Sequence, residues 1–398
     1  MTTVDLIYCD AGGGHRAAAA ALEAVIRAQQ RPWQVRRVNL FQALDPQDRI
    51  RRITGAPPEA YYNRRLASGW TLGLAQELKL LQGLIRYGHA SLVKRLARHW
   101  RDTRPDLVVS LVPNFNRALH QSLAAARPGV PCVTVMTDLA DFPPRFWIDP
   151  GSTAHLVCGS ARAVAQARAL GVEEQRIHRC SGMIVRPDFY DQLALDRTAE
   201  RMRLGLDPAR TTGVVMFGGQ GSTAMLEIAR RLDDVQLILL CGRHRALADA
   251  LRREPSGAPR AVVEFTPEVR RYLMLADFFI GKPGPGSLSE AVQQGLPIVT
   301  LRNRWTLPQE RYNADWVREQ GLGLVIGRVS EIGPAVAALQ ARLDAYRANV
   351  RAQVNRAVFE VPEILAAILE SRAPEVARPG GIAHAATAQP VTRLSSGA

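Results

Sequence analysis

Short apolar segments alternate with segments of helical periodicity along most of the chain. Each apolar segment has the length of a strand, and those of the first half lie at residues 4–9, 33–40, 106–112, 132–137 and 154–158. The second half repeats the plan with apolar segments at residues 213–218, 235–241, 261–265, 277–281 and 297–301. This alternation predicts an α/β protein built on parallel, doubly wound sheets.

The same pattern divides the chain into two similar halves. Each half opens with a strand, a glycine-rich loop and a helix, and strand character is lost between residues 187 and 210. We therefore expect one α/β domain over 1–190 and a second over 205–345, followed by a helix over 346–370. The stretch 371–398 is rich in Ala, Gly, Pro and Ser, a composition that predicts a disordered tail.

One insertion interrupts the alternation in the first half. Over residues 49–104 it has twelve Lys and Arg and three acidic residues, a net charge of +9. It contains Trp70 and Trp100, and its apolar residues recur at helical spacing: Leu74, Leu78, Leu81, Ile85, Leu92 and Leu96. A basic amphipathic segment of this kind predicts contact with an anionic membrane surface. The alternative is an ordinary surface helix whose basic face is solvated.

Composition limits the class of protein without choosing a function. The chain has 398 residues, of which 47% are hydrophobic, and its net charge is +14. These values exclude a collagen, a wholly disordered chain and a disulfide-stabilised peptide. All but three of the 51 cations are Arg, a bias expected of a GC-rich genome, so the total charge alone does not identify a partner. Five widely spaced cysteines without a C-x-x-C pair favour buried free thiols. The first residues lack the pattern of a signal peptide and no apolar run has the length of a spanning helix, so we expect a cytoplasmic protein.

The first glycine-rich loop, residues 10–16, carries candidate catalytic side chains. Its consecutive glycines allow backbone N–H groups to approach a ligand. His15 stands at the start of the next helix, five residues after Asp10, which suits a general base with an orienting carboxylate. A structural or capping histidine is the alternative. The loop also fits the dinucleotide fingerprint loosely, but Asn39 and Leu40 stand where that site requires an acid.

Two glycine-rich loops of the second half each follow a predicted strand and precede a helix. They are Gly218-Gly219-Gln220-Gly221-Ser222 and Lys282-Pro283-Gly284-Pro285-Gly286-Ser287. Backbone amides of two such loops predict a nucleotide held beyond the carboxyl ends of the strands. Alternatively, Ser287 and Glu290 form an N-terminal capping box on the following helix. Neither loop continues as a P-loop, and no metal-binding signature is present, so we expect no metal.

Several motifs in a fixed order resemble those of glycosyltransferase family 28. They are DAGGGHRAAA (10–19), PDLVVSL (105–111), VTVMTDL (133–139), GMIVRPDF (182–189), FIGKPGPGSLSEAVQQGLPIV (279–299) and QERYNA (309–314). Over residues 4–345 the chain resembles the monogalactosyldiacylglycerol synthases and, more distantly, the lipid-linked N-acetylglucosaminyltransferase of peptidoglycan synthesis. The resemblance implies a GT-B fold, in which two Rossmann-like domains face each other across a cleft. Departures lie mainly in the first half, where Asn114 stands in place of a His-Pro pair and residues 140–147 lack a Cys-His-Pro.

The resemblance implies a UDP-sugar site in the second domain. The backbone at Phe265 and Thr266 would hold the uracil, and Glu290 would bind the ribose hydroxyls. The diphosphate would be held by Arg186 and by the two loops, at Gly218, Gly219, Gln220, Gly221, Ser222, Gly284, Pro285, Gly286 and Ser287. The sugar hydroxyls would be bound by side chains that each hold two hydroxyls: Gln309, Glu310 and Asn313.

The resemblance also implies that the first domain binds a lipid acceptor, beside Gly13, Gly14 and Asp138. An acceptor hydroxyl, expected to belong to diacylglycerol, would attack the anomeric carbon while UDP leaves from the opposite face. A hexose, with galactose favoured over glucose and N-acetylglucosamine, would thus become a β-glycolipid. His15 is the predicted base, with Asp10 orienting it or acting itself. The protein would work on the inner face of the plasma membrane, and its oligomeric state is open.

Other functions remain open at this point. A GT-B transferase with another lipid-linked or lipopolysaccharide acceptor has the same donor motifs, and a UDP-binding protein without activity is a further alternative. A nucleic-acid-binding protein would explain the charge of +14, but aromatic residues make up only 6% of the chain and no basic-aromatic interleaving occurs. We therefore expect a UDP-sugar, a lipid and an anionic membrane surface as partners, and no nucleic acid.

Overall fold

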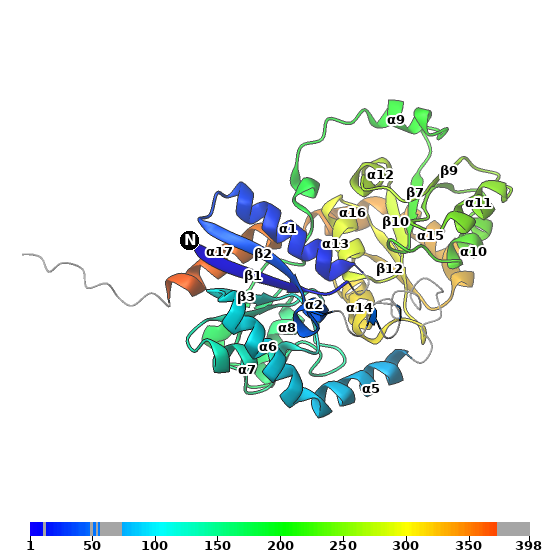
Figure 1. Ribbon diagram of the computed structural model, residues 1–398. Helices are drawn as coiled ribbons and strands as arrows, with labels where there is room; N and C mark the ends of the chain where they lie inside the picture. The colour runs from blue at the N-terminus through cyan, green and yellow to red at the C-terminus, as the bar shows by residue number, and fades with distance from the viewer. Residues whose placement is uncertain (11–12, 48–50, 53–54, 56–73, 372–398) are drawn as a thin grey trace, which may run out of the picture.

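The protein, a computed structural model, contains two six-stranded parallel sheets, one in each half of the chain (Figure 1). The structure describes residues 1–10, 13–47, 51–52, 55 and 74–371. The first sheet has the order β2-β1-β3-β4-β5-β6, with strands β1 Thr2–Tyr8, β2 Trp33–Asn39, β3 Leu107–Ser110, β4 Cys132–Val135, β5 His155–Cys158 and β6 Ile177–Arg179. The second has the order β12-β11-β10-β7-β8-β9, with strands β7 Thr212–Met216, β8 Gln236–Leu240, β9 Arg260–Val263, β10 Phe278–Gly281, β11 Ile298–Leu301 and β12 Gly323–Ile326. The predicted α/β class with two doubly wound sheets is confirmed, and β6 and β12 are strands that the apolar pattern did not predict.

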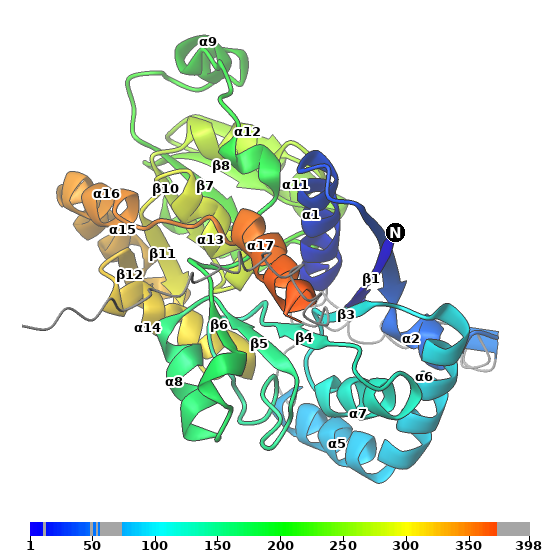
Figure 2. The same ribbon diagram turned by 90° about the vertical axis from the view of Figure 1, so that its left-hand side faces the viewer.

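Helices follow most of the strands and cover both faces of each sheet (Figure 2). In the first half they are α1 Gly14–Ala28, α2 Leu40–Leu44, α5 Leu74–Tyr87, α6 His89–Thr103, α7 Asn116–Ala126 and α8 Ala161–Ala169, with the 3₁₀ helices η1 Glu174–Arg176 and η2 Pro187–Tyr190. In the second half they are α9 Arg197–Arg203, α10 Ala224–Arg231, α11 Arg245–Arg253, α12 Val269–Leu275, α13 Pro285–Gln293, α14 Arg311–Glu319, α15 Ile332–Ala341, α16 Leu343–Arg351 and α17 Ala357–Glu370, with the 3₁₀ helices η3 Pro308–Glu310 and η4 Val329–Glu331.

The core of each half is a pair of apolar layers on the two faces of its sheet. Successive residues of a strand point to opposite faces, so Phe279 packs in one cluster with Leu288 of α13. Its neighbours Phe278 and Ile280 pack in the other cluster with Leu247 of α11. Because both faces are covered, the strands are nearly uniform apolar runs, and this uniformity made them recognisable in the sequence.

The last helix returns to the first half of the protein. Val358, Val361, Leu365 and Ile368 of α17 are buried in the cluster that contains Leu22 of α1, and Figure 2 shows the two helices side by side. The prediction of one helix after the second sheet is therefore wrong: this stretch forms α16 and α17, and α17 packs on the other sheet. The predicted disordered tail, 371–398, lies outside the described residues except for Ser371.

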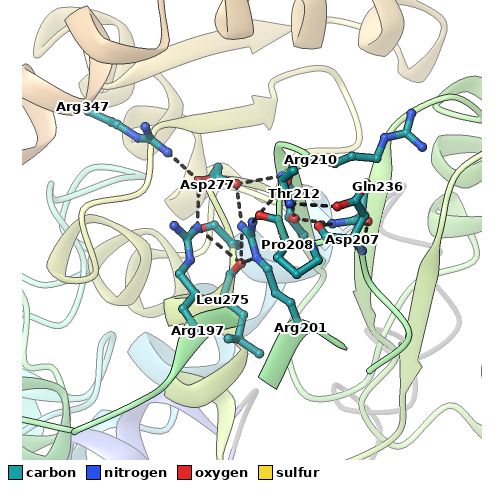
Figure 3. A network of polar contacts seen from close by, with 12 residues as sticks. Arg197, Arg201, Asp207, Pro208, Arg210, Thr212, Gln236, Leu275, Asp277 and Arg347 are labelled. Carbon is teal, nitrogen blue, oxygen red and sulfur yellow. Dashed lines mark hydrogen bonds and ion pairs between the residues drawn. The ribbon is translucent and has the colours of Figure 1, made fainter. Parts of the chain in front are cut away.

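A single buried carboxylate anchors the segments that lead into and out of the second sheet. Asp277, just before β10, pairs with Arg197 at 2.8 Å and Arg201 at 2.7 Å on α9, and with Arg347 at 2.6 Å on α16 (Figure 3). It also accepts a hydrogen bond of 2.8 Å from the backbone N–H of Thr212. Burial alone would raise the pKa of Asp277, but the Thr212 N–H and Arg197 lower it overall.

The basic insertion is helical where the structure describes it. It forms α5 and α6, whereas residues 49–50, 53–54 and 56–73, with Trp70, lie outside the described residues. Trp100 is fully buried, and its indole Nε1 donates a hydrogen bond of 2.8 Å to Ser122. Trp100 therefore belongs to the core beneath α6 and does not support the predicted contact of the insertion with a membrane. On α5, in contrast, large apolar side chains are exposed: Leu80, Leu81, Leu84 and Tyr87.

Candidate active site

Both sheets have a point at which the strand order reverses, and the glycine-rich loops lie there. In the second sheet, β7 and β10 are neighbours, and they lead into the loops 218–222 and 282–287. In the first sheet, β1 and β3 are neighbours, and β1 is followed by Asp10 and by Gly13, the N-cap residue of α1. Ligands of open α/β sheets bind at such switch points, outside the carboxyl ends of the strands.

The loop after β7 depends on glycine geometry. Gly218 and Gly221 have φ values of +74° and +70°, in the left-handed region that favours glycine. A Cβ atom on Gly221 would lie 2.4 Å from the carbonyl oxygen of Cys241, so the loop packs directly against the end of β8. Nothing lies within 4 Å of the Cβ position of the exposed Gly219. The loop therefore leaves open space at Gly219, where a ligand can approach the backbone.

The loop after β10 runs directly into α13. This helix begins at Pro285, its N-cap residue is Gly284, and no side chain caps it. The alternative prediction of a capping box between Ser287 and Glu290 is therefore wrong, because Ser287 lies inside the first turn. The backbone N–H groups of Gly286 and Ser287 belong to that first turn, and Gly286 is exposed. Such a helix start attracts an anion through its free N–H groups and its dipole.

Lys282 contacts both loops of the second half, and the sequence analysis named it in the second loop without assigning it a role. Its Nζ lies 2.7 Å from Oε1 of Glu310, which is 7% exposed. Its side chain also lies 3.7 Å from the Cβ position of Gly218 and 3.5 Å from that of Gly284. The signal that could have found it is its rarity, since it is one of three lysines and stands directly after a buried strand.

The predicted sugar-binding residues lie on η3 and α14, beside this lysine. Gln309 is half-buried, whereas Asn313 has no exposed surface. The Asn313 amide donates a hydrogen bond of 2.9 Å to the carbonyl oxygen of Pro283. The structure thus brings Glu310 to Lys282 and gives Asn313 a contact with the loop that precedes α13.

Glu290, Arg186 and the turn at Phe265 form a second group beside α13. Burial raises the pKa of Glu290 to about 7, and the positive charge of Arg186 partly opposes this rise. Arg186 donates a hydrogen bond of 3.2 Å to the carbonyl oxygen of Pro267. Phe265 is 52% exposed, and the guanidinium of Arg243 lies 4.2 Å from the centre of its ring. Thr266, next to it, accepts a hydrogen bond of 3.0 Å from the backbone N–H of Glu268 through its hydroxyl.

In the first half, the described part of the first loop presents His15. Gly13, with φ +84°, is the N-cap residue of α1, and Gly14 is exposed in open space. His15 is half-buried, and its Nδ1 lies 3.1 Å from the hydroxyl of Thr137. Burial lowers the pKa of His15 to about 4, with a backbone hydrogen bond at Leu111 acting in the opposite direction.

Asp10 pairs with a side chain other than His15. Its carboxylate pairs with Arg16 at 3.1 Å. The partner of the His15 Nδ1 is Thr137, from the loop after β4. Nδ1 thus faces a hydroxyl that follows β4, and the role of Asp10, as the orienting carboxylate or as the base itself, stays a prediction.

Asp138 connects the two halves electrostatically. It is 6% exposed and accepts a hydrogen bond of 2.9 Å from the indole Nε1 of Trp147. Burial raises the pKa of Asp138 to about 7; the Trp147 hydrogen bond lowers it, the charge of Glu310 raises it and that of Lys282 lowers it. Glu310 and Lys282 belong to the second half, so the loops at the carboxyl ends of the two sheets lie close together.

A second contact between the halves lies nearby. The guanidinium of Arg162 on α8 lies 5.9 Å from the ring centre of Tyr312 on α14. Tyr312 stands between Glu310 and Asn313 in the sequence, so the predicted sugar motif borders the first half. Within the described ranges, no group of three or more His, Cys, Asp or Glu residues is arranged to hold a metal ion.

Comparisons with known proteins bear on the fold and on the sequence relationship. No protein-family model matches the chain. The chain is 28% identical to the probable monogalactosyldiacylglycerol synthase 2 of rice chloroplasts (Oryza sativa subsp. japonica) over 350 residues, covering 80% of this chain and 69% of that protein. Its fold matches that of Acinetobacter baumannii MurG with a TM-score of 0.60 at 12% identity, covering 92% of this chain and 100% of that one. It also matches Staphylococcus aureus MnaA in complex with UDP, with a TM-score of 0.58 at 14% identity, covering 92% and 95%. The predicted GT-B fold and the distant relationship to the galactolipid synthases are confirmed.

Proposed function

We propose that this GT-B glycosyltransferase, a distant relative of the monogalactosyldiacylglycerol synthases, transfers a hexose from a UDP-sugar to the hydroxyl group of a lipid. The proposal rests on three features that lie close together: the Lys282–Glu310 ion pair, the two glycine-rich loops of the second half, and Asp138 of the first half. The Lys282–Glu310 ion pair lies against both glycine-rich loops of the second half, and its charges reach Asp138 of the first half. A donor and an acceptor held at this place would be in contact.

The second half offers groups that match each part of a UDP-sugar. The first-turn amides of Gly286 and Ser287, with Lys282 and Arg186, can bind the diphosphate, since amides and cations together neutralise an anion. The Glu290 carboxylate can accept hydrogen bonds from the ribose hydroxyls, and the exposed Phe265 can lie beside the uracil. The structural neighbour MnaA holds UDP, which supports a uridine nucleotide on this fold.

The proposed reaction is an inverting displacement. His15 Nε2 takes the proton of the acceptor hydroxyl, the hydroxyl oxygen attacks the anomeric carbon, and the bond from that carbon to the diphosphate breaks with its electron pair. The negative charge that grows on the diphosphate is stabilised by the start of α13, Lys282 and Arg186. Alignment of both substrates between the two halves would lower the activation barrier, because the reacting atoms are already held in the right orientation.

Diacylglycerol is the proposed acceptor and galactose the proposed sugar, because these are named in the synthases to which the chain is similar. The exposed apolar side chains of α5, with the basic residues of the insertion, suit contact with an anionic bilayer. No helix among the described residues has the length and the apolar character that a membrane crossing requires. The proposed association with the inner face of the membrane is peripheral and rests on the exposed apolar side chains of α5.

A transfer assay tests the proposal. The full chain is incubated with vesicles that contain diacylglycerol and with UDP-galactose, UDP-glucose or UDP-N-acetylglucosamine, each labelled in the sugar. We expect label to enter the lipid phase, most of all from UDP-galactose, as a β-glycoside. Transfer only to a polyprenyl-linked or lipopolysaccharide acceptor would overturn the choice of lipid, and binding of UDP without any transfer would overturn the activity. A protein that does not bind UDP would contradict the whole proposal.

A further inference from the structure

Two consecutive residues of the loop after β4 hold the aromatic side chains of the first-half site. The Thr137 hydroxyl lies 3.1 Å from Nδ1 of His15, and the Asp138 carboxylate accepts a hydrogen bond of 2.9 Å from Trp147. The rings of His15 and Trp147 lie 6.1 Å apart between centres. The imidazole is therefore held by a hydroxyl on one nitrogen and bordered by an indole that is itself fixed.

We propose that Thr137 is a positioning residue that holds His15 in the tautomer protonated on Nδ1. A neutral imidazole carries one N–H, and a threonine hydroxyl can either donate or accept a hydrogen bond. A backbone carbonyl only accepts, so the hydrogen bond at Leu111 also requires an N–H of the ring. When Nδ1 carries that hydrogen, Thr137 and Leu111 both accept from it, and the lone pair of Nε2 is left to take a proton. The inference rests on the proposed function, in which that proton comes from the acceptor hydroxyl.

A hydroxyl performs this task differently from the carboxylate of a catalytic triad. A carboxylate would fix the tautomer and also stabilise the imidazolium, whereas a hydroxyl fixes the tautomer and adds no charge. Burial in turn keeps the imidazole neutral through the neutral pH range. In the proposed step the proton moves to Nε2, the new bond joins the acceptor oxygen to the anomeric carbon, and UDP leaves with the electron pair. The imidazolium then returns its proton to solvent.

Nuclear magnetic resonance of the full chain, labelled with ¹⁵N in its histidines, tests the tautomer without any need for activity. A His15→Gln variant identifies the signals of His15. We expect the wild type to show Nδ1 protonated and Nε2 unprotonated, Thr137→Ser to keep this pattern, and Thr137→Val to shift toward protonation on Nε2. An Nε2-protonated His15 in the wild type, or an unchanged pattern in Thr137→Val, would overturn the inference.

Kinetics supply the second measurement. We expect Thr137→Val to lower kcat about tenfold or more, with KM for the UDP-sugar within about twofold of the wild type, and Thr137→Ser to restore most of the loss. Wild-type kcat in Thr137→Val would contradict the role, as would an equal loss in both variants. If the wild type transfers no sugar, the proposed function fails, while the spectra still decide whether Thr137 sets the tautomer.

Discussion

The Nζ atom of Lys282 lies 2.7 Å from Oε1 of Glu310, and the lysine side chain lies beside both second-half glycine loops, at Gly218 and Gly284. Glu310 is almost fully buried, so its charge is balanced by Lys282 rather than by water. The diphosphate of a donor would give Lys282 a second anionic partner. In the proposed site, the pair would therefore connect recognition of the sugar, through Glu310, with neutralisation of the leaving diphosphate, through Lys282.

The first prediction concerns this lysine. Lys282→Met removes the cation between the two loops and leaves the Glu310 carboxylate unpaired. We expect the affinity for a UDP-sugar, measured by calorimetry, to fall about tenfold or more, the effect of losing a charge-assisted hydrogen bond. Lys79→Met, on the exposed side of α5, is the matched control and should bind like the wild type. Equal affinity in both variants would remove Lys282 from the donor site.

The second prediction is a pH dependence at Glu290. Because burial raises its pKa to about 7, this carboxyl is partly protonated in the empty site at neutral pH. Ribose hydroxyls donate to the ionised form, so binding favours deprotonation and affinity should rise with pH up to about 7 and then level off. Between pH 6 and 8 we expect about a tenfold gain in UDP-sugar affinity.

Glu290→Gln should flatten that profile, because the amide does not titrate. Asp138→Asn is the control, since Asp138 also has a pKa raised to about 7 but belongs to the first half. The slope should persist in Asp138→Asn. A profile that is flattened by the Asp138 substitution and kept by the Glu290 substitution would reverse the assignment.

The third prediction concerns stability. Asp277→Asn leaves three arginines, Arg197, Arg201 and Arg347, without their shared carboxylate. We expect the free energy of unfolding to fall by about 3 kcal/mol, measured by urea denaturation. Because the pKa of Asp277 is lowered in the folded protein, its contribution is present above the ordinary aspartate pKa and is lost as the pH falls below it.

The matched control for Asp277 is Asp249→Asn. Asp249 pairs with Arg252 on the surface of α11, and its side chain is 56% exposed. An exposed pair of this kind contributes little, so we expect a change within about 0.5 kcal/mol. Similar losses in the two variants would show that the arginine network is not an anchor of the second sheet.

The fourth prediction concerns α5. Leu80 and Leu84 are 65% and 59% exposed on this helix, which belongs to the basic insertion. Replacing both by Gln should weaken sedimentation of the protein with vesicles that contain anionic lipid, because the apolar area that enters the bilayer is reduced. Met202→Gln, which changes a similarly exposed apolar residue on α9, should have no effect. Sedimentation that is unchanged both by the two substitutions and by the anionic lipid content would argue against membrane contact through α5.

The sequence predicted the fold well, because both faces of each parallel sheet are covered and most of the strands are therefore apolar runs. The same signal failed where a strand is short or half-buried, as in β6 (IHR) and β12 (GLVI). It also failed for α17, because periodicity shows that a helix has an apolar face but not which sheet that face covers. Trp100 illustrates the same limit, since an aromatic residue near a helix end can be interfacial or, as here, buried.

The sequence motifs predicted some of the residues that lie together at the candidate site, but not all of them. Glu310 and the two loops of the second half lie together, as neighbouring strands require. Lys282 and Thr137 were given no role, although both stand in the quoted motifs, because the contact of each is with a residue distant in the sequence. Asp10 was paired with His15 on sequence distance alone, but the sheet places the loop after β4 beside that ring.

The most direct test of the division between donor and acceptor functions compares His15→Ala with Glu290→Ala. Both variants are measured for UDP binding by calorimetry and for transfer of labelled galactose from UDP-galactose to diacylglycerol vesicles. The account predicts that His15→Ala binds UDP like the wild type but loses about 100-fold or more of the transfer rate, whereas Glu290→Ala loses UDP affinity. Wild-type transfer in His15→Ala, or unchanged UDP affinity in Glu290→Ala, would contradict it.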